Sequence, residues 1–290
     1  MSSNISASAE QDYQRDGFII LENVVPEQTL NEMCAEAGNI CSGRRGDVAG
    51  ASALAGLSQA EVMNQVISIH FPHKISPYLY DLLFEEHVVE ALARLVGPNV
   101  KCMQSMFFVK QAGRPGQAWH QDEMFIPTRD RSLIGAWIAV DNATVDNGCL
   151  WVIPGSHRPG ILWQTRAHND ARFDHTEESF GYPFDQDQAI PVELEAGSIV
   201  LFNGYLLHRS LNNTRKEGYR RSYVNHYMSA ESLLPWSGGC LDHPVEDYRD
   251  VVLVAGKDPY AYKGVEDISV PYLRPADAAE KLQLAETIKL

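Results

Sequence analysis

The spacing of apolar residues changes near the middle of the chain. From Pro26 to Cys41 and from Tyr78 to Val96, apolar positions recur at helical spacing, which predicts helices that pack one face against a core. Beyond Asn99 the pattern becomes a series of short apolar runs separated by turn residues, which is typical of strands. We expect eight such strands, around 100–110, 117–125, 133–141, 149–153, 189–194, 198–203, 205–210 and 220–229.

Helices followed by a run of strands predict a mainly β fold with flanking helices. The architecture expected is a double-stranded β-helix, the cupin-like jelly roll, with helices over its outer face. No linker rich in Pro, Ser or Gly divides the chain, so we expect a single domain over 1–290. Its parts are a helical N-terminal part (1–97), a jelly-roll core (98–230) and a C-terminal extension (231–290) with a helix from Pro275.

Two long stretches carry no regular pattern, 43–76 and 155–188. Segments of this length in a compact domain are commonly lids or binding loops, so we expect them to border a ligand site. Arg129 and Arg131, just beyond the strand at 117–125, are candidate lid residues that would meet an anionic substrate. The alternative is that both are loop arginines that face solvent.

Composition narrows the range of partners. The chain has 24 Lys and Arg against 38 Asp and Glu, a formal net charge of −14. This charge argues against nucleic-acid and membrane partners, because phosphate surfaces are bound by clustered Lys and Arg. The five cysteines are scattered, and no apolar run approaches the length of a membrane span. We therefore expect a soluble cytoplasmic protein with reduced thiols and a small-molecule substrate.

The pair His120 and Asp122 is the first chemical signal. On an extended strand alternate side chains point to the same side, so this imidazole and carboxylate are expected to lie together. They would be two ligands of a 2-His-1-carboxylate triad, which leaves positions open on Fe(II) for 2-oxoglutarate and O₂. His168 and Asp170 have the same spacing, but their polar surroundings lack strand alternation and indicate a solvated loop.

His208 is the candidate third ligand, because it follows a convincing apolar strand near the far end of the predicted roll. A lone histidine beside a strand is often structural, but Arg220 and Arg221 enter the last strand soon afterwards. A guanidinium holds a carboxylate by paired hydrogen bonds, as the distal carboxylate of 2-oxoglutarate would require. Ser210 could add a hydroxyl to that grip. For either arginine, a surface cation on an edge strand is the alternative.

The order of these segments resembles the phytanoyl-CoA dioxygenase family of Fe(II)/2-oxoglutarate oxygenases. The resemblance runs from about Gly97 to Ala230. The segments that carry it are Gly97-Pro98-Asn99, Trp119-His120-Gln121-Asp122, Ala136-Trp137, the stretch from Asn147 to His157, Leu207-His208-Arg209-Ser210 and Gly218-Tyr219-Arg220. Together they are far more specific than the His-x-Asp spacing alone.

The resemblance implies that three residues bind the iron and that Arg220 anchors 2-oxoglutarate. Arg221 is the alternative anchor, because only one of two adjacent strand residues faces inward. The implied iron ligands are His120, Asp122 and His208, with no catalytic residue beyond them. The implied lining of the cosubstrate pocket is Gln104, Met106, Gln121, Trp137 and Ser210. His70, a further lid candidate, lies near where a family member presents another cosubstrate contact.

The implied activity is hydroxylation of an unactivated C–H bond of a small-molecule metabolite, with release of succinate and CO₂. The carboxylate of Asp122 disfavours halogenation, because related halogenases carry a small residue at that position. Desaturation, cyclisation or epoxidation at the same iron centre are alternatives. A jelly-roll protein that binds a metal and a small acid without turnover is the alternative from a different class.

Overall fold

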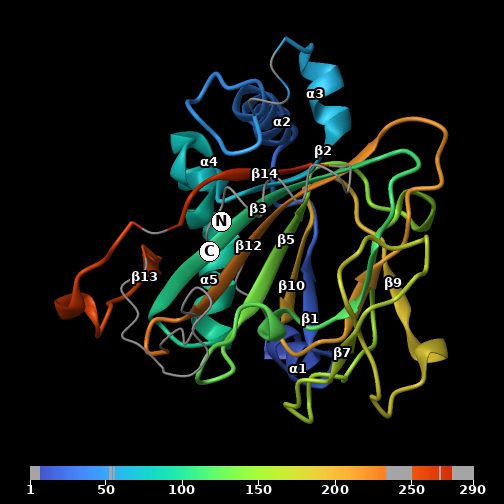
Figure 1. Ribbon diagram of the computed structural model, residues 1–290. Helices are drawn as coiled ribbons and strands as arrows, with labels where there is room; N and C mark the ends of the chain where they lie inside the picture. The colour runs from blue at the N-terminus through green and yellow to red at the C-terminus, as the bar shows by residue number, and fades with distance from the viewer. Residues whose placement is uncertain (1–6, 52–53, 55, 233–249, 268, 276–290) are drawn as a thin grey trace.

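The computed structural model describes residues 7–51, 54, 56–232, 250–267 and 269–275 (Figure 1). Its centre is a pair of β-sheets with a shared apolar interior. The larger sheet has the strand order β1-β10-β5-β12-β3-β2-β14, with β13 also paired to β3, and the smaller has the order β4-β11-β6-β9. This is the jelly roll that the sequence predicts.

The strands of the larger sheet are β1 (Phe18–Leu21), β2 (Val66–His70), β3 (Val100–Gln111), β5 (Ile134–Ala139), β10 (Ile199–Asn203), β12 (Tyr219–Ser229), β13 (Val252–Ala255) and β14 (Tyr272–Pro275). Those of the smaller sheet are β4 (Gln117–His120), β6 (Leu150–Val152), β9 (Ile190–Val192) and β11 (His208–Ser210). A separate ribbon pairs β7 (Thr165–Arg166) with β8 (Glu178–Ser179). All eight strands expected after Asn99 are therefore present.

The strand expected over 117–125 is shorter than its apolar pattern predicts. β4 ends at His120, and Asp122 begins the 3₁₀ turn η4 (Asp122–Met124). Gln121 between them keeps an extended backbone, with φ −129° and ψ 127°. The side chains of His120 and Asp122 therefore still emerge toward the same side, as the alternation argument requires.

The helices are α1 (Ala7–Asp16), α2 (Glu27–Cys41), α3 (Gln59–Gln65), α4 (Pro77–Asp81) and α5 (Glu86–Leu95). Short 3₁₀ turns are η2 (Pro72–Lys74), η3 (Leu82–Phe84), η5 (Val145–Asn147), η6 (Gln186–Gln188) and η7 (Ala261–Lys263). The continuous helix expected from Tyr78 to Val96 is broken at Glu85. Its backbone is extended and its carboxylate accepts a hydrogen bond from the Val88 N–H at 2.8 Å, so it begins a new helix instead of continuing the old one.

Two parts of the chain contain more regular structure than their patterns predict. The stretch 43–76 includes α3, begun by a capping box between Ser58 and Glu61, and then β2. The C-terminal extension contributes β13 and β14 to the larger sheet. Pro275 ends β14, and the helix expected after it falls on 276–290, outside the described residues.

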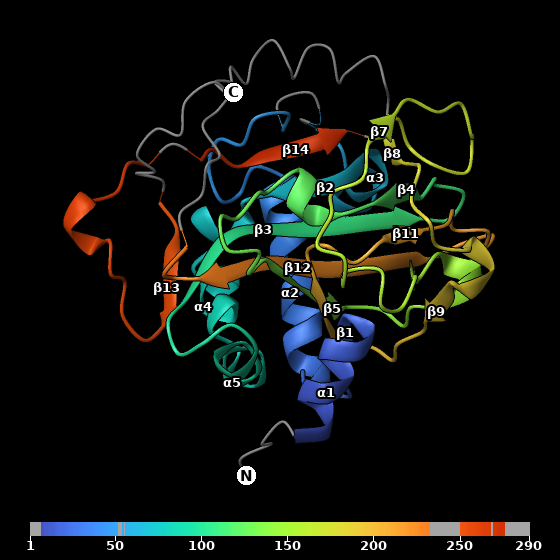
Figure 2. The same ribbon diagram turned by 90° about the horizontal axis from the view of Figure 1, so that it is seen from below.

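The two faces of the larger sheet have different roles. Helices α1, α2, α4 and α5 lie on its outer side (Figure 2), where Met33 and Leu92 join Phe107 and Tyr223 in one apolar core. A hydrogen bond also ties α4 to the sheet, because the Tyr223 hydroxyl donates to the Leu79 carbonyl at 2.8 Å. The inner face meets the smaller sheet, and the residues between them include Trp137, Leu150, Val152, Phe202 and Val224. The space between the two inner faces is therefore where a site can form.

Within the described residues, no helix combines the length and the apolar character needed to cross a membrane.

Candidate metal centre and adjoining cavity

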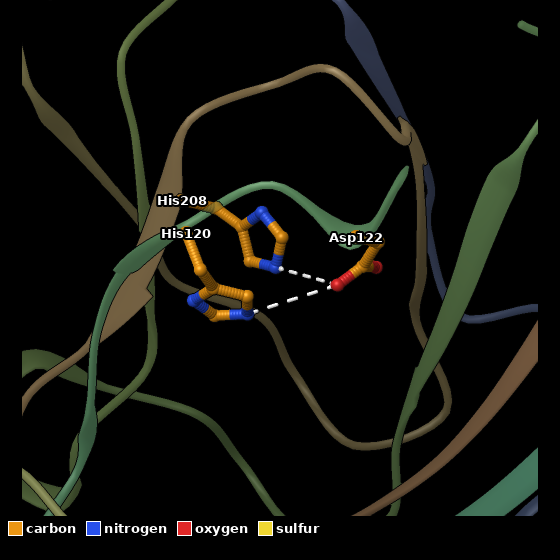
Figure 3. A group of neighbouring side chains, drawn as sticks. All are labelled: His120, Asp122 and His208. Atoms are coloured by element: carbon orange, nitrogen blue, oxygen red, sulfur yellow. Dashed lines mark ion pairs between the residues drawn. The ribbon is translucent and has the colours of Figure 1, made fainter. Parts of the chain in front are cut away.

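His120, Asp122 and His208 lie together where β4 ends and β11 begins (Figure 3). His120 ends β4 and faces His208 across the antiparallel pairing with β11, with ring centroids 4.0 Å apart. Asp122 reaches them from η4, and its Oδ1 is 3.7 Å from His120 Nε2 and 3.5 Å from His208 Nε2. All three ligand atoms lie within 4.8 Å of one another, so a single small cation could contact all of them.

The backbone holds both imidazoles in the orientation of metal ligands. The Nδ1 of His120 lies 2.7 Å from the Ala118 carbonyl, and that of His208 lies 2.9 Å from the Leu206 carbonyl. A carbonyl oxygen only accepts, so each Nδ1 carries the proton and donates. Nε2 is therefore the ring nitrogen that each histidine turns toward Asp122.

The protonation states of the cluster also suit a cation. Burial, with the adjacent His208, lowers the pKa of His120 to about 4, so its ring is neutral at physiological pH. Burial alone would raise the pKa of Asp122, but His208 and a hydrogen bond from His226 outweigh it, and this pKa lies below its usual range. The cluster is thus a buried carboxylate with neutral imidazole beside it.

His226 supports the carboxylate from behind. Its Nε2 lies 3.1 Å from Asp122 Oδ2, the oxygen that does not face the two ring nitrogens. The sequence interpretation missed His226, although a signal was present. It stands six positions after Arg220 on β12, so alternation puts both on the same face of the sheet.

A cavity of about 1190 Å³ extends from this cluster between the two sheets. Neighbouring strands β3 and β12 supply its floor in directly opposed pairs, with Lys110 opposite Arg220 and Gln104 opposite His226. Predicted residues that line it are His70, Gln104, Met106, His120, Asp122, Trp137, His208, Ser210 and Arg220. Both stretches expected to border a ligand site also contribute, as Ala49 and Phe71 from the first and Asp174 and Thr176 from the second.

Arg220 and Arg221 point to opposite faces of β12. Arg221 lies outside the cavity and pairs with Asp141 through two hydrogen bonds of 2.8 and 2.6 Å. Arg220 is only 4% exposed, and its guanidinium carbon lies 5.3 Å from the centre of the Trp137 ring. Its Nη1 donates to Ser222 Oγ at 3.0 Å, but its buried Nε has no hydrogen-bond partner among the described residues. Burial lowers the pKa of Arg220 to about 10, so the guanidinium remains charged at neutral pH.

Three predicted residues lie elsewhere: the expected placement of Gln121 is corrected, and Arg129 and Arg131 are exposed, as the alternative for these two arginines states. Gln121 does not line the cavity, because its side chain points away from the cluster and donates to the Ile161 and Tyr205 carbonyls at 3.0 and 2.8 Å. Arg129 and Arg131 are also absent from the lining. Arg131 packs instead over the Tyr205 ring, with 5.8 Å between the guanidinium carbon and the ring centre.

The second His-x-Asp pair lies in a loop, as its polar surroundings indicate. His168 Nε2 contacts the Thr176 carbonyl at 2.8 Å, and Asp170 pairs with Arg172 at 2.6 Å. Neither belongs to a group of metal-ligating side chains among the residues the structure describes. Position in the fold, not spacing, therefore distinguishes the two motifs.

Comparison with known sequences identifies relatives of the chain. The family model for phytanoyl-CoA dioxygenase (PhyH) matches residues 13–222. A phytanoyl-CoA dioxygenase of Arabidopsis thaliana is 32% identical over 164 residues, which cover 56% of this chain and 56% of that protein. A second relative from Oryza sativa, phytanoyl-CoA dioxygenase 1, is 34% identical over half of each chain. The aligned part thus spans little more than half the length of these relatives.

Comparison with solved structures agrees with this fold. The apo form of the non-heme monooxygenase ThoJ has a TM-score of 0.65 at 18% identity and covers 96% of this chain and 92% of its own. At these identities the likeness establishes a shared fold. Since the family model spans most of the sequence, including all three residues of the cluster and Arg220, the chain belongs to the phytanoyl-CoA dioxygenase family.

Proposed function

We propose that this chain is an Fe(II)- and 2-oxoglutarate-dependent oxygenase that hydroxylates an unactivated C–H bond of a small-molecule metabolite. The observation that carries the proposal is one cavity lined both by the cluster of His120, Asp122 and His208 and by Arg220, a buried cation that forms no ion pair with any described residue. A 2-oxo dicarboxylate requires both, because its keto-acid end chelates a metal while its far carboxylate needs a charged donor.

The donor set of the cluster fits Fe(II). Two imidazoles and one carboxylate are the ligands of non-haem Fe(II) oxygenases, and they leave coordination positions open. His120 and His208 would present Nε2 and Asp122 would present Oδ1, since the other polar atoms of these side chains already have partners. Iron bound there would supply the activation of O₂ that the reaction needs.

The distal part of the cavity fits the far carboxylate of 2-oxoglutarate. A buried guanidinium with an unpartnered Nε is costly unless an anion completes its hydrogen bonds. Trp137 holds the Arg220 guanidinium from one side, and Ser210 lies in the same lining as a second polar contact. Gln104 and Met106 would border the cosubstrate on the β3 side.

The remaining walls would hold the substrate and exclude water. Apolar side chains surround the cluster on the inner faces of both sheets, including Phe108, Leu150, Phe202 and Val224. The stretch 155–188 is tied over the cavity by Asp174, which accepts a hydrogen bond from Arg274 of β14 at 2.5 Å. His70, stacked on Tyr272 with 4.2 Å between ring centres, would line the substrate side. Burial lowers the pKa of His70 to about 3, so it would present a neutral ring.

The test is to supply purified protein with Fe(II), 2-oxoglutarate and O₂ across a panel of small-molecule substrates. The expected result is substrate-dependent formation of succinate and CO₂ together with a product heavier by one oxygen atom. A product lighter by two hydrogen atoms would assign desaturation or cyclisation at the same centre. Binding of 2-oxoglutarate without succinate from any substrate would contradict the oxygenase and favour a binding protein.

Cyclisation, the alternative to hydroxylation, is a reaction named for a protein of the same fold. SnoK, described as a non-heme alpha ketoglutarate dependent carbocyclase from nogalamycin biosynthesis, has a TM-score of 0.63 at 22% identity and covers 87% of this chain and 97% of its own. A jelly roll of this kind therefore supports ring closure as well as hydroxylation. The mass of the product separates the two reactions.

Replacing His226 with Ala is expected to weaken Fe(II) binding by about 10- to 100-fold, the usual cost of losing a hydrogen bond to a metal ligand. The reason is that Asp122 Oδ2 would lose its 3.1 Å contact with His226 Nε2 and the carboxylate could rotate. The measurement is an anaerobic Fe(II) titration against a competing chelator. His226→Gln, which can return an N–H to the carboxylate, is expected to recover most of the affinity. Equal loss in both variants would argue against this role.

A further inference from the structure

Lys110 is a buried cation in the cavity that the proposed function leaves without a role. It is 7% exposed and lies directly opposite Arg220, on the strand pairing of β3 with β12. Its ammonium contacts three oxygens, those of Ser210 Oγ at 2.9 Å, the Leu211 carbonyl at 2.6 Å and the Gly148 carbonyl at 3.3 Å. Three acceptors match the three N–H donors of a lysine ammonium.

The charge of Lys110 has no partner of opposite sign in direct contact. Among the described residues no carboxylate forms an ion pair with Lys110, and its three contacts are all neutral oxygens. Burial, and then the adjacent Arg220, lower the pKa of Lys110 well below its usual value. An anion beside these two cations would oppose both effects, because it offsets the lost hydration and the mutual repulsion. The pair is therefore suited to receive a carboxylate.

Ser210 is oriented by this lysine. Its Oγ accepts a hydrogen bond from the Lys110 ammonium at 2.9 Å and another from the Gln117 N–H at 3.3 Å. A serine hydroxyl has two lone pairs and one proton, so these two bonds occupy the acceptor sites and leave the proton to be donated. Ser210 lines the cavity, where an anion could receive that proton in a hydrogen bond.

The backbone around the lysine is shaped to admit it. Gly148 has φ +82°, and a Cβ at this position would come within 2.4 Å of the Leu211 carbonyl oxygen and 3.0 Å of Lys110 Nζ. Glycine adopts this conformation without a steric penalty and leaves room for the ammonium between the two carbonyls. The backbone at Gly148 and Leu211 therefore leaves a defined place for the Lys110 ammonium.

We propose that Lys110 is a positioning residue for the far end of the cosubstrate: it holds Ser210 as a hydrogen-bond donor and adds a second positive charge beside Arg220. This inference rests on the proposed function and goes beyond it by assigning selection among 2-oxo acids. The pocket would favour an acid with an anionic far end over one with an apolar end of the same length. Arg220 contacts the carboxylate directly, and Lys110 acts through Ser210 and through its charge.

The test measures binding by calorimetry, without turnover, on anaerobic Fe(II)-loaded protein. The two ligands are 2-oxoglutarate and 2-oxovalerate, which have the same five-carbon chain but differ in the far carboxylate. Lys110→Met is expected to weaken 2-oxoglutarate binding by about 10- to 100-fold, the range for a charged hydrogen bond. Binding of 2-oxovalerate is expected to change by less than about twofold, because that ligand has no carboxylate at this end. The ratio of the two affinities is the readout.

Lys101→Met is the matched control. Lys101 is also a buried lysine of β3, but it does not line the cavity and pairs with Asp258 at 2.7 Å. Its loss is expected to lower thermal stability without changing the affinity ratio. The double variant Lys110→Met/Ser210→Ala is expected to lose less binding free energy for 2-oxoglutarate than the sum of the losses in the two single variants. The reason is that the lysine acts partly through the serine.

The outcomes separate this inference from the proposed function. If the unmodified protein does not bind 2-oxoglutarate, the proposed function is wrong. If it binds 2-oxoglutarate and Lys110→Met keeps the original affinity ratio, the inference about Lys110 is wrong. If Lys110→Met does not fold, Lys110→Gln is the deciding variant, because it retains N–H donors for the carbonyls and removes only the charge. An unchanged ratio in that variant would equally overturn the inference.

Discussion

Replacing Asp122 with Ala is expected to lower succinate formation by at least about 100-fold, more than the usual cost of a residue that only supports a ligand. The change removes the one carboxylate of the cluster and leaves two imidazoles, which bind a hard divalent cation less firmly. It also leaves His226 without its 3.1 Å partner. Turnover and Fe(II) affinity should fall together, and both are measured on the same purified protein.

The chain contains a matched control for this experiment. Asp170 has the same His-x-Asp spacing, but it pairs with Arg172 in a loop and does not line the cavity. Asp170→Ala is therefore expected to leave both turnover and Fe(II) affinity unchanged. An Asp122→Ala protein that kept full turnover would overturn the assignment of the cluster as the iron site.

Replacing Arg220 with Ala is expected to raise the KM for 2-oxoglutarate by about 30-fold or more, since removing one member of a buried charge pair costs about 2–5 kcal/mol. Arg220 is 4% exposed and its Nε has no partner in the part of the chain that the structure describes, so a bound carboxylate would depend on this side chain. The effect should appear mainly in KM, with a smaller fall in kcat at saturating 2-oxoglutarate. Steady-state kinetics with 2-oxoglutarate as the varied component measure it.

Arg221→Ala is the control for this second experiment. Arg221 is the neighbour in sequence but faces away from the cavity, where it holds Asp141 through two hydrogen bonds. Its loss should reduce thermal stability, while the KM for 2-oxoglutarate stays close to that of the unmodified protein. A large rise in KM for Arg221→Ala with a mild one for Arg220→Ala would exchange their roles.

The eight strands of the core were predictable because each has its own apolar run between turn residues, and that signal is local. β2 and β14 were not predicted, because the pattern of apolar residues in each does not differ clearly from that of the irregular segments around it. Each strand is stabilised by pairing with a distant segment. Pairing of this kind depends on partners far away in sequence, so no window of the chain contains the information. The break of the long helix at Glu85 is local instead: it depends on one backbone conformation and one hydrogen bond to the Val88 N–H, which the spacing of apolar residues does not reveal.

Two kinds of sequence pattern predicted parts of the candidate site: the alternation of side chains along a strand and the order of the motifs along the chain. Alternation implies that only one of Arg220 and Arg221 faces inward, and motif order links His208 to His120 and Asp122. Alternation extended along the same strands would also have included Lys110, which shares a face of β3 with Gln104 and Met106. The same alternation predicts that Gln121 points away from the cavity, because it lies between the inward side chains of His120 and Asp122.

The sequence by itself determined the jelly roll, the family and the three residues of the cluster, because these follow from local periodicity and from motifs in a defined order. Only the tertiary structure decided which arginine enters the cavity, that Lys110 and Ser210 lie beside it, and that His226 supports Asp122. These are relations between residues about 100 positions apart, such as Lys110 with Ser210 and Asp122 with His226. They exist only because antiparallel pairing and sheet packing bring distant strands into contact, which no local pattern specifies.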